Sequence, residues 1–231
     1  MKRVREREAK RRGDAHSVRM RNNLKILSAA EEVFAEKGFD GATTQEIANR
    51  AGIPKANVHY YFRTKKDIYL AVMNSIMGPW LEAFQAISPD DDPTEALTNY
   101  IRRKVMLSKE RPQASRIFAN EMIRGAPVLA EFLGNDLNAW VDEKADILRQ
   151  WVKLGKMDPV SPHHLFFIIW AATQTYADFE VQVRNILRRD RLTNKDYEAA
   201  ADLITTLVLK GCGVSSASSG MSVGNNTKGS A

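Results

Sequence analysis

The sequence predicts an all-α fold, and three observations support that prediction. Apolar residues recur at helical spacing along most of the 231-residue chain. No segment shows the strict apolar–polar alternation of a half-buried strand. Glycines, prolines and capping residues fall between the apolar stretches, where helices begin and end. We therefore expect a small N-terminal three-helix unit followed by a larger helical domain.

The composition is that of a globular chain, with 44% hydrophobic and 27% charged residues. No run of apolar residues is long enough to cross a membrane, and none follows the basic start as it would in a secretory signal. Cys212 is the only cysteine, so no intrachain disulfide can form. These features favour a cytoplasmic protein.

Positive charge is concentrated at the N-terminus. Residues 1–25 contain ten Lys/Arg and three Asp/Glu, whereas the rest of the chain is almost neutral and the net charge of the whole is +6. A flexible basic arm over residues 1–21, beside a neutral body, suits the approach to a polyanion. The charge distribution alone is equally compatible with a solvated tail that binds no partner.

The first predicted helix covers residues 22–37 and ends at Gly38. Thr43 and Glu46 match the capping box of a short second helix that ends at Ala51-Gly52. Pro54 fits the first turn of a third helix, which runs to about Tyr61. Thr64 caps a fourth helix that we expect to reach Ile87.

Further helices are expected over the rest of the chain, at about 94–109, 113–124, 126–155 with a possible break at Gly134, 162–187 and 194–210. Ser161-Pro162 has the pattern of a serine cap followed by a first-turn proline. The three aspartates at 90–92 are read as a solvated loop in preference to a cation site. Residues 212–231 are read as a disordered tail because they are small, polar and rich in glycine.

Residues 44–62 have the layout of a helix-turn-helix, in which Ala51-Gly52-Ile53 forms the turn and the second helix can enter a major groove. We assign residues 22–68 to this domain and residues 69–211 to the larger domain. The layout by itself has only modest specificity, since many helical proteins contain such a turn.

The segments ILSAA (26–30), VFAEKGF (33–39), TTQEIA (43–48), AGI (51–53) and YFRTK (61–65) make the resemblance specific. Together they resemble the signature of the TetR family of transcriptional regulators across residues 22–72. The resemblance implies a DNA-binding domain, a ligand-binding and dimerisation domain, and action as a repressor.

The resemblance also implies which residues contact DNA. Thr43 and Thr44 would bind phosphate at a helix N-terminus, and Lys65 would contact the backbone. Lys55 and Asn57 are the candidates for base-edge or nearby phosphate contacts. Tyr60 and Tyr61 can donate hydroxyls to phosphate, while Phe62 is expected in the core. His59 departs from the family, which most often has tyrosine there; a half-buried structural role for His59 remains open.

Such regulators bind near-palindromic DNA as symmetric dimers. The resemblance implies that the helices 162–187 and 194–210 pair with a second copy as a four-helix bundle. The apolar positions expected on that surface are Leu203, Ile204, Leu207 and Val208.

Trp170, Gln174 and Asp178 are four residues apart and share one face of a helix. An aromatic wall beside an amide with both a donor and an acceptor suits a small planar ligand. On spacing alone, Trp170 could equally be ordinary core and Gln174 a satisfied buried amide.

The sensor half carries a closer resemblance, through PQASRIF (112–118), NEM (120–122), GAP (125–127), DEK (142–144), WVK (151–153), WAATQ (170–174) and YADF (176–179). These segments resemble the pyrimidine-utilisation (Rut-type) regulators within the TetR family. The resemblance implies uracil or thymine as effector, with Trp80, Trp170 and Gln174 central and Phe118, Met122 and Asp178 contributing. The fourth helix would transmit binding by changing its tilt and so the spacing of the two reading helices.

Three other interpretations were weighed. An enzyme is disfavoured because His163 and His164 are adjacent on a helix and make a poor metal pair, and no phosphate loop, dinucleotide turn or nucleophile elbow occurs. No catalytic residue, cofactor or metal site is therefore expected. A non-specific architectural DNA binder is disfavoured by the neutral body. A TetR-type repressor for another planar or aromatic metabolite is the remaining alternative.

Overall fold

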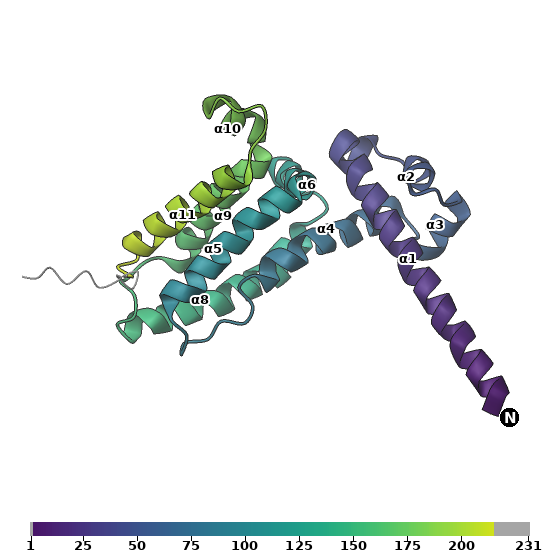
Figure 1. The fold of residues 1–231 in the computed structure, drawn as a ribbon, viewed down its shortest axis with the longest axis horizontal. Helices are drawn as coiled ribbons and strands as arrows, with labels where there is room; N and C mark the ends of the chain where they lie inside the picture. Colours follow the sequence, from purple (N-terminus) through teal and green to yellow (C-terminus); the bar gives the residue numbers. More distant parts are fainter. Residues whose placement is uncertain (1, 215–231) are drawn as a thin grey trace, which may run out of the picture.

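The computed structural model describes the backbone of residues 2–214 and the side chains of residues 17–214. Every regular element in that part of the chain is a helix, so the all-α prediction is confirmed (Figure 1). A small head is built from the first three helices, and α4 joins it to a larger helical bundle (Figure 1). None of the described helices is long and apolar enough to cross a membrane.

The head consists of α1 (Lys2–Gly41), α2 (Thr44–Ala51) and α3 (Lys55–Tyr61). Its core buries Phe34, Ile47 and Val58, one from each helix. Burying these apolar surfaces against one another stabilises helices that would be too short to persist alone. Gly52 has a φ of 64°, the left-handed conformation that lets the chain turn sharply between α2 and α3.

The N-terminal segment differs from the expectation of a flexible arm. Residues 2–21 continue α1 as helix, and this extension projects away from the head (Figure 1). Lysine, arginine, glutamate and alanine, which dominate its sequence, all have high helix propensity. The expected stop at Gly38 is present as a local break, with φ 68° and ψ 179°. Residue 1 lies outside the described part of the chain.

Helix α4 (Lys65–Glu82) crosses from the head to the bundle without a break at residue 68. Thr64 and Asp67 form its capping box, which confirms the predicted start. The helix ends before Ile87. The amides that follow it bond to carbonyls three residues earlier, as the Phe84 amide does to the Leu81 carbonyl at 3.2 Å, and this tighter turn replaces the α-helical pattern.

The bundle contains α5 (Pro93–Glu110), α6 (Pro112–Ile123), α7 (Ala130–Phe132), the π-helical turn η1 (Leu133–Leu137), α8 (Asn138–Lys153), α9 (Pro162–Asp178), α10 (Glu180–Ile186) and α11 (Asn194–Gly211). Helix α5 packs against α9 and α11, and α6 packs against α9 and also against α1 of the head. Helix α6 therefore belongs to both halves of the molecule.

Two predicted helices of the bundle are divided. The 126–155 segment breaks into α7, η1 and α8 around Gly134, as the sequence allowed. The 162–187 helix was expected to be continuous but breaks at Phe179, whose φ of −116° and ψ of 30° are not helical. Pro162 occupies the first turn as predicted, whereas Ser161 makes no side-chain capping bond.

The C-terminal end of the helical domain lies beyond the predicted residue 211. Cys212 and Val214 were placed in a tail but are only 1% and 7% exposed. The Cys212 carbonyl accepts the Asp158 amide at 2.8 Å, and the Val214 amide donates to the Leu209 carbonyl at 2.9 Å. Packed apolar side chains and satisfied backbone groups extend the domain to residue 214. The expected disorder of residues 215–231 lies outside the described residues.

The aspartate loop is held by a lysine. Lys156 Nζ donates to the carbonyls of Pro89, Asp90 and Asp91 at 2.9–3.0 Å. Asp92 caps α5 by accepting the Thr94 amide at 3.0 Å. The loop therefore leads into α5, and its backbone carbonyls are held by the single ammonium group of Lys156.

Candidate DNA-binding and ligand-binding sites

Helix α3 presents one buried and several exposed positions. Val58 anchors it in the head core, while Lys55, Asn57, His59 and Tyr60 are exposed. His59 is thus available at the surface, and the half-buried structural role left open for it is not what the structure shows. Tyr61 and Phe62 are half-buried and pack against the head core. The side chains suggested for base reading therefore lie on the outer face of a well-anchored helix.

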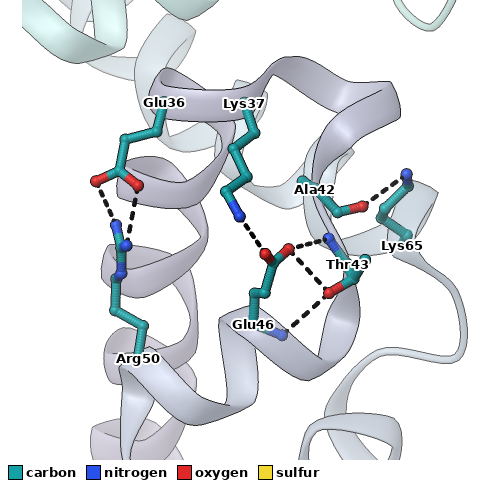
Figure 2. A network of polar contacts seen from close by, with 7 residues as sticks. All are labelled: Glu36, Lys37, Ala42, Thr43, Glu46, Arg50 and Lys65. Atoms are coloured by element: carbon teal, nitrogen blue, oxygen red, sulfur yellow. Dashed lines mark hydrogen bonds and ion pairs between the residues drawn. The ribbon is translucent and has the colours of Figure 1, made fainter.

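A polar network fastens α2 to α1 and to the residue that caps α2 (Figure 2). Glu46 of α2 accepts the Thr43 amide at 3.1 Å and pairs with Lys37 of α1. Arg50 at the other end of α2 makes a two-pronged contact with Glu36, at 2.6 and 2.9 Å. Bidentate pairs fix orientation as well as distance, so α2 is fastened to α1 at both ends.

Two of the predicted phosphate contacts, Thr43 and Lys65, already have hydrogen-bond partners within the protein. The Thr43 hydroxyl donates to Glu46 Oε2 at 2.9 Å and accepts the Glu46 amide at 3.2 Å. Thr44 is the half-buried first residue of α2. Lys65 Nζ donates to the carbonyls of Ala42 at 2.9 Å and Asp40 at 3.3 Å and lies 4.6 Å from the Phe39 ring centroid (Figure 2). Thr43 and Lys65 therefore position the head in this structure.

Arg19 was not singled out by sequence reasoning. Its guanidinium carbon lies 5.8 Å from the Tyr60 ring centroid, so the basic helix passes close to the exposed face of α3. Both side chains are exposed. The contact puts a cation beside the candidate phosphate-binding hydroxyl of Tyr60.

A cavity lies in the bundle where α4, α5, α6, α8 and α9 meet. Its lining is mostly aromatic and aliphatic, with one amide and one amine: Met77, Trp80, Leu81, Tyr100, Lys104, Phe118, Phe132, Leu137, Trp140, Trp170 and Gln174. The cavity has a volume of about 40 Å³, which leaves room for only a few waters. A planar ring would enter only if side chains in this lining moved apart.

Four of the six predicted ligand residues line this cavity: Trp80, Phe118, Trp170 and Gln174. Met122 is not among the lining residues and packs against the apolar core that the head shares with α4 and α6. Asp178 is not among the lining residues and accepts the Ser115 hydroxyl at 2.5 Å. Burial raises the pKa of Asp178, while the Ser115 hydrogen bond and Lys104 oppose that rise.

The polar groups around the cavity are unequally satisfied. Trp170 Nε1 donates to the Tyr100 hydroxyl at 2.6 Å, so Trp170 offers a ring face and no free donor. Burial raises the pKa of Tyr100, which keeps its hydroxyl protonated. The side-chain amide of Gln174 makes no hydrogen bond to any residue among 17–214. Its amide is available to a ligand edge.

Sequence reasoning missed Tyr100, Lys104 and Trp140 as lining residues. Tyr100 and Lys104 are four apart on α5 and share one face of that helix. A signal existed, because Lys104 interrupts an otherwise apolar stripe that includes Leu97 and Ile101. Nothing in the spacing indicates that this stripe faces Trp170 from another helix.

Four contacts made by residues of α6 or directly beside it join this helix to α1 and α4. Arg111, just before α6, donates to Glu31 at 2.5 Å and to the Ser75 carbonyl at 2.6 Å. Glu121 accepts the Tyr69 hydroxyl at 2.9 Å, and Arg124 pairs with Asp40. The same helix lines the cavity with Phe118, whose ring meets the Trp80 ring edge-on at 5.1 Å. A change at the cavity wall therefore has a short path to α1 and α4.

The outer face of α9 and α11 is apolar. Phe167 and Ile168 of α9 are 52% and 60% exposed, and Leu203 and Leu207 of α11 are 59% and 62% exposed. Ile204 and Val208 were expected on this surface, but they are buried in the protomer's own core. Adjacent helical positions point about 100° apart, so one pair faces outward and the other inward.

The helix-turn-helix head, the bundle with its cavity and the apolar α9–α11 face define a ligand-responsive DNA-binding protein. The family model described as "Bacterial regulatory proteins, tetR family" matches residues 26–72, and that of the "YcdC-like protein, C-terminal region" matches residues 73–215. The chain belongs to the TetR family of bacterial transcriptional regulators and is not an enzyme.

Its similarity to one relative extends through the sensor half. The chain is 43% identical over 183 residues to the HTH-type transcriptional regulator RutR of Escherichia coli K12, an alignment that covers 78% of this chain and 86% of RutR.

Solved structures share the fold. A transcriptional regulator from Streptomyces coelicolor aligns with a TM-score of 0.64 at 25% identity, over 82% of this chain and 97% of that one. FadR from Bacillus subtilis, in complex with stearoyl-CoA, aligns with a TM-score of 0.61 at 20% identity, over 81% and 98%.

Proposed function

We propose that this transcriptional regulator is a cytoplasmic homodimeric repressor that leaves a near-palindromic operator when it binds a small planar pyrimidine such as uracil or thymine. It would then control genes of pyrimidine or nitrogen catabolism. The observation that carries the proposal is the cavity in which the Trp80 and Trp170 rings and the free Gln174 amide face the same space. Aromatic rings give a planar base its stacking surface, and one amide can pair with a base edge.

The wider contacts support the coupling. Trp80 stands near the end of α4, and the other end of α4 is capped beside the reading head. Two reading helices in a dimer must be separated by about 34–36 Å, one turn of DNA. A ligand that favours one tilt of α4 would change that separation, to the extent that its affinity differs between the two arrangements. The sequence resemblance to pyrimidine-utilisation regulators supports the choice of effector.

The test is a calorimetric titration of the purified protein with uracil, thymine and cytosine. Wild type should bind uracil or thymine saturably, and Trp170→Ala and Gln174→Ala should each lose that binding. Gln150→Ala, an exposed position on α8, is the matched control and should bind as wild type does. No binding of any of the three bases by wild type would contradict the pyrimidine proposal.

Operator release is measured separately. A ligand that binds should weaken the protein's affinity for its operator in a DNA-binding assay at fixed salt. A ligand that raises the melting temperature but leaves operator affinity unchanged would contradict the coupling through α4.

A further inference from the structure

Lys104 is a buried side chain whose amine borders the cavity and has no hydrogen-bond partner among residues 17–214. It is 3% exposed, lies on α5 and lines the aromatic cavity. Within residues 17–214 its Nζ atom has no hydrogen bond and no carboxylate within 4.0 Å. The one described contact of its ammonium is with the Trp80 ring, whose centroid lies 4.2 Å away.

The second buried lysine of the bundle shows the ordinary arrangement. Lys144 is 1% exposed, and its Nζ donates to the Gln85 carbonyl at 2.9 Å and to Glu143 at 2.7 Å. Buried charges are retained where they are paired, because an unpaired one is expensive to remove from water. An apolar side chain of similar length would fill the place of Lys104 at lower cost if packing were its only role.

The charges around Lys104 come from few elements. Burial lowers its pKa to about 7, and the carboxylate of Asp178 on α9 acts in the opposite direction. That carboxylate is itself engaged by Ser115 and feels Arg116, both on α6. Tyr100 is the other titratable group of α5 at the cavity, and α4 contributes the uncharged Trp80.

We propose that Lys104 is a ligand-binding residue whose amine donates a hydrogen bond to a carbonyl oxygen of a planar ring that enters beside Trp80, so that the cavity selects rings with an imide-type edge. This inference rests on the proposed function and adds a residue and a selection rule to it. The ring takes the place that the ammonium now occupies over Trp80.

The donor inventory explains the selection. Gln174 offers a donor and an acceptor, the protonated amine of Lys104 offers donors only, and the Trp170 indole N–H is already bonded to Tyr100. An imide edge, with a ring N–H between two carbonyls, gives Lys104 an acceptor. Where cytosine places its exocyclic amine toward Lys104, two donors meet and both lose their partners. Uracil and thymine should therefore be preferred to cytosine.

Protonation is linked to this contact. An ammonium that gains a carbonyl partner holds its proton more tightly, so ligand binding raises the pKa of Lys104. At pH 8 binding should take up as much as about one proton per site. The ammonium form of Lys104 binds the carbonyl more tightly than the neutral amine does. Affinity for uracil should therefore fall as pH rises above 7, because more of the amine then has to take up a proton on binding.

The experiment is calorimetry of wild type, Lys104→Met and Lys109→Met with uracil and cytosine. Titrations at pH 8 in buffers of different ionisation enthalpy give the proton uptake. Lys104→Met should bind uracil about ten- to a hundredfold more weakly than wild type, without proton uptake, and should discriminate less against cytosine. Lys109→Met, on the same helix, should behave as wild type does.

The outcomes separate the two proposals. Uracil binding by Lys104→Met within a few-fold of wild type, or the absence of proton uptake by wild type, overturns the role of Lys104 and leaves the pyrimidine proposal standing. Failure of wild type to bind any pyrimidine overturns both. If Lys104→Met does not fold, the proton uptake of wild type decides the question alone.

Discussion

Glu121 and Lys104 are both buried charged side chains, yet the structure treats them differently. Glu121 is 2% exposed and accepts the Tyr69 hydroxyl and the amides of Val128 and Leu129 at 2.7–3.2 Å. Its carboxylate is fully engaged and ties α6 to α4. In the described part of the chain, the Lys104 amine contacts the Trp80 ring and has no hydrogen-bond partner. A buried amine without a hydrogen-bond partner indicates that Lys104 binds ligand. A buried carboxylate with all its partners indicates that Glu121 holds the scaffold together.

Lys104→Met should stabilise the protein, most strongly at low pH. Burial lowers the pKa of Lys104 in the folded state to about 7, from the usual lysine value of 10.5. Below pH 7 both states hold the proton, and the folded state bears the full penalty of a buried charge. Between the two pKa values the unfolded state binds more protons, so wild-type stability rises with pH and the advantage of the variant shrinks.

The advantage should be roughly 2–4 kcal/mol at pH 6 and smaller at pH 9. Urea unfolding at several pH values measures it, with Lys109→Met as control. Equal stability of Lys104→Met and wild type at pH 6 would contradict the burial of an unpaired ammonium.

At the scale of elements, α6 and the N-terminal part of α1 matter most for coupling the cavity to the head and for binding DNA. Helix α6 contributes Phe118 to the cavity and bonds α4 through Glu121, and Arg124 directly after it pairs with Asp40 of α1. The extension of α1 carries most of the excess positive charge and passes Tyr60 with Arg19. One element is suited to transmit ligand binding and the other to bind phosphates.

Tyr69→Phe should weaken the coupling between the two sites. It removes the hydroxyl that donates to Glu121 and leaves one carboxylate oxygen without that partner, which should cost about 1–3 kcal/mol of stability. Ligand affinity should change little, because Tyr69 is not among the cavity-lining residues. The ratio of operator affinities with and without ligand should fall. Tyr197→Phe, which makes no contact with the head, is the control, and an unchanged ratio in Tyr69→Phe would contradict a role for this hydrogen bond.

Deletion of residues 1–20 should flatten the salt dependence of DNA binding. Each phosphate that is neutralised contributes roughly −0.9 to the slope of log affinity against log salt, because counterions are released. Operator affinity measured at several salt concentrations gives the slope for wild type and for the deletion. The same slope in both proteins would show that the basic helix does not bind the backbone.

At the scale of the whole molecule, α9 and α11 present an apolar face that a monomer would leave in water. Ile168 and Leu207 line the same groove on α9 and α11, and Phe167 and Leu203 extend the exposed surface. TetR regulators act as dimers, so a second copy of the chain would bury this face. The symmetric pairing of two heads is also what a near-palindromic operator requires.

Leu203→Asp combined with Leu207→Asp should convert the protein to a monomer and reduce operator affinity severely. Two carboxylates cannot be buried unpaired in an apolar contact. Sedimentation or light scattering measures the mass, and circular dichroism checks the fold. Leu154→Asp, a 60% exposed position at the end of α8, is the control and should leave the assembly unchanged. A double variant with wild-type mass would place the dimer contact elsewhere.

The sequence by itself determined the helices, the helix-turn-helix and the family. These depend on local signals: the capping boxes at Thr43 and Thr64, the left-handed turn at Gly52 and the first-turn proline at 162. Such signals act within a few residues, so spacing alone predicts them. The expectation at Phe179 failed because the apolar pattern continues through a position where the backbone turns.

Only the tertiary structure decided which side chains share a site. It brought Lys104 and Tyr100 of α5 to Trp80 and Trp170, which lie on two other helices, and it directed Asp178 toward Ser115. It also turned Ile204 and Val208 inward beside the outward Leu203 and Leu207. Contacts between distant segments depend on how helices rotate and pack against one another, and a single sequence does not specify that rotation.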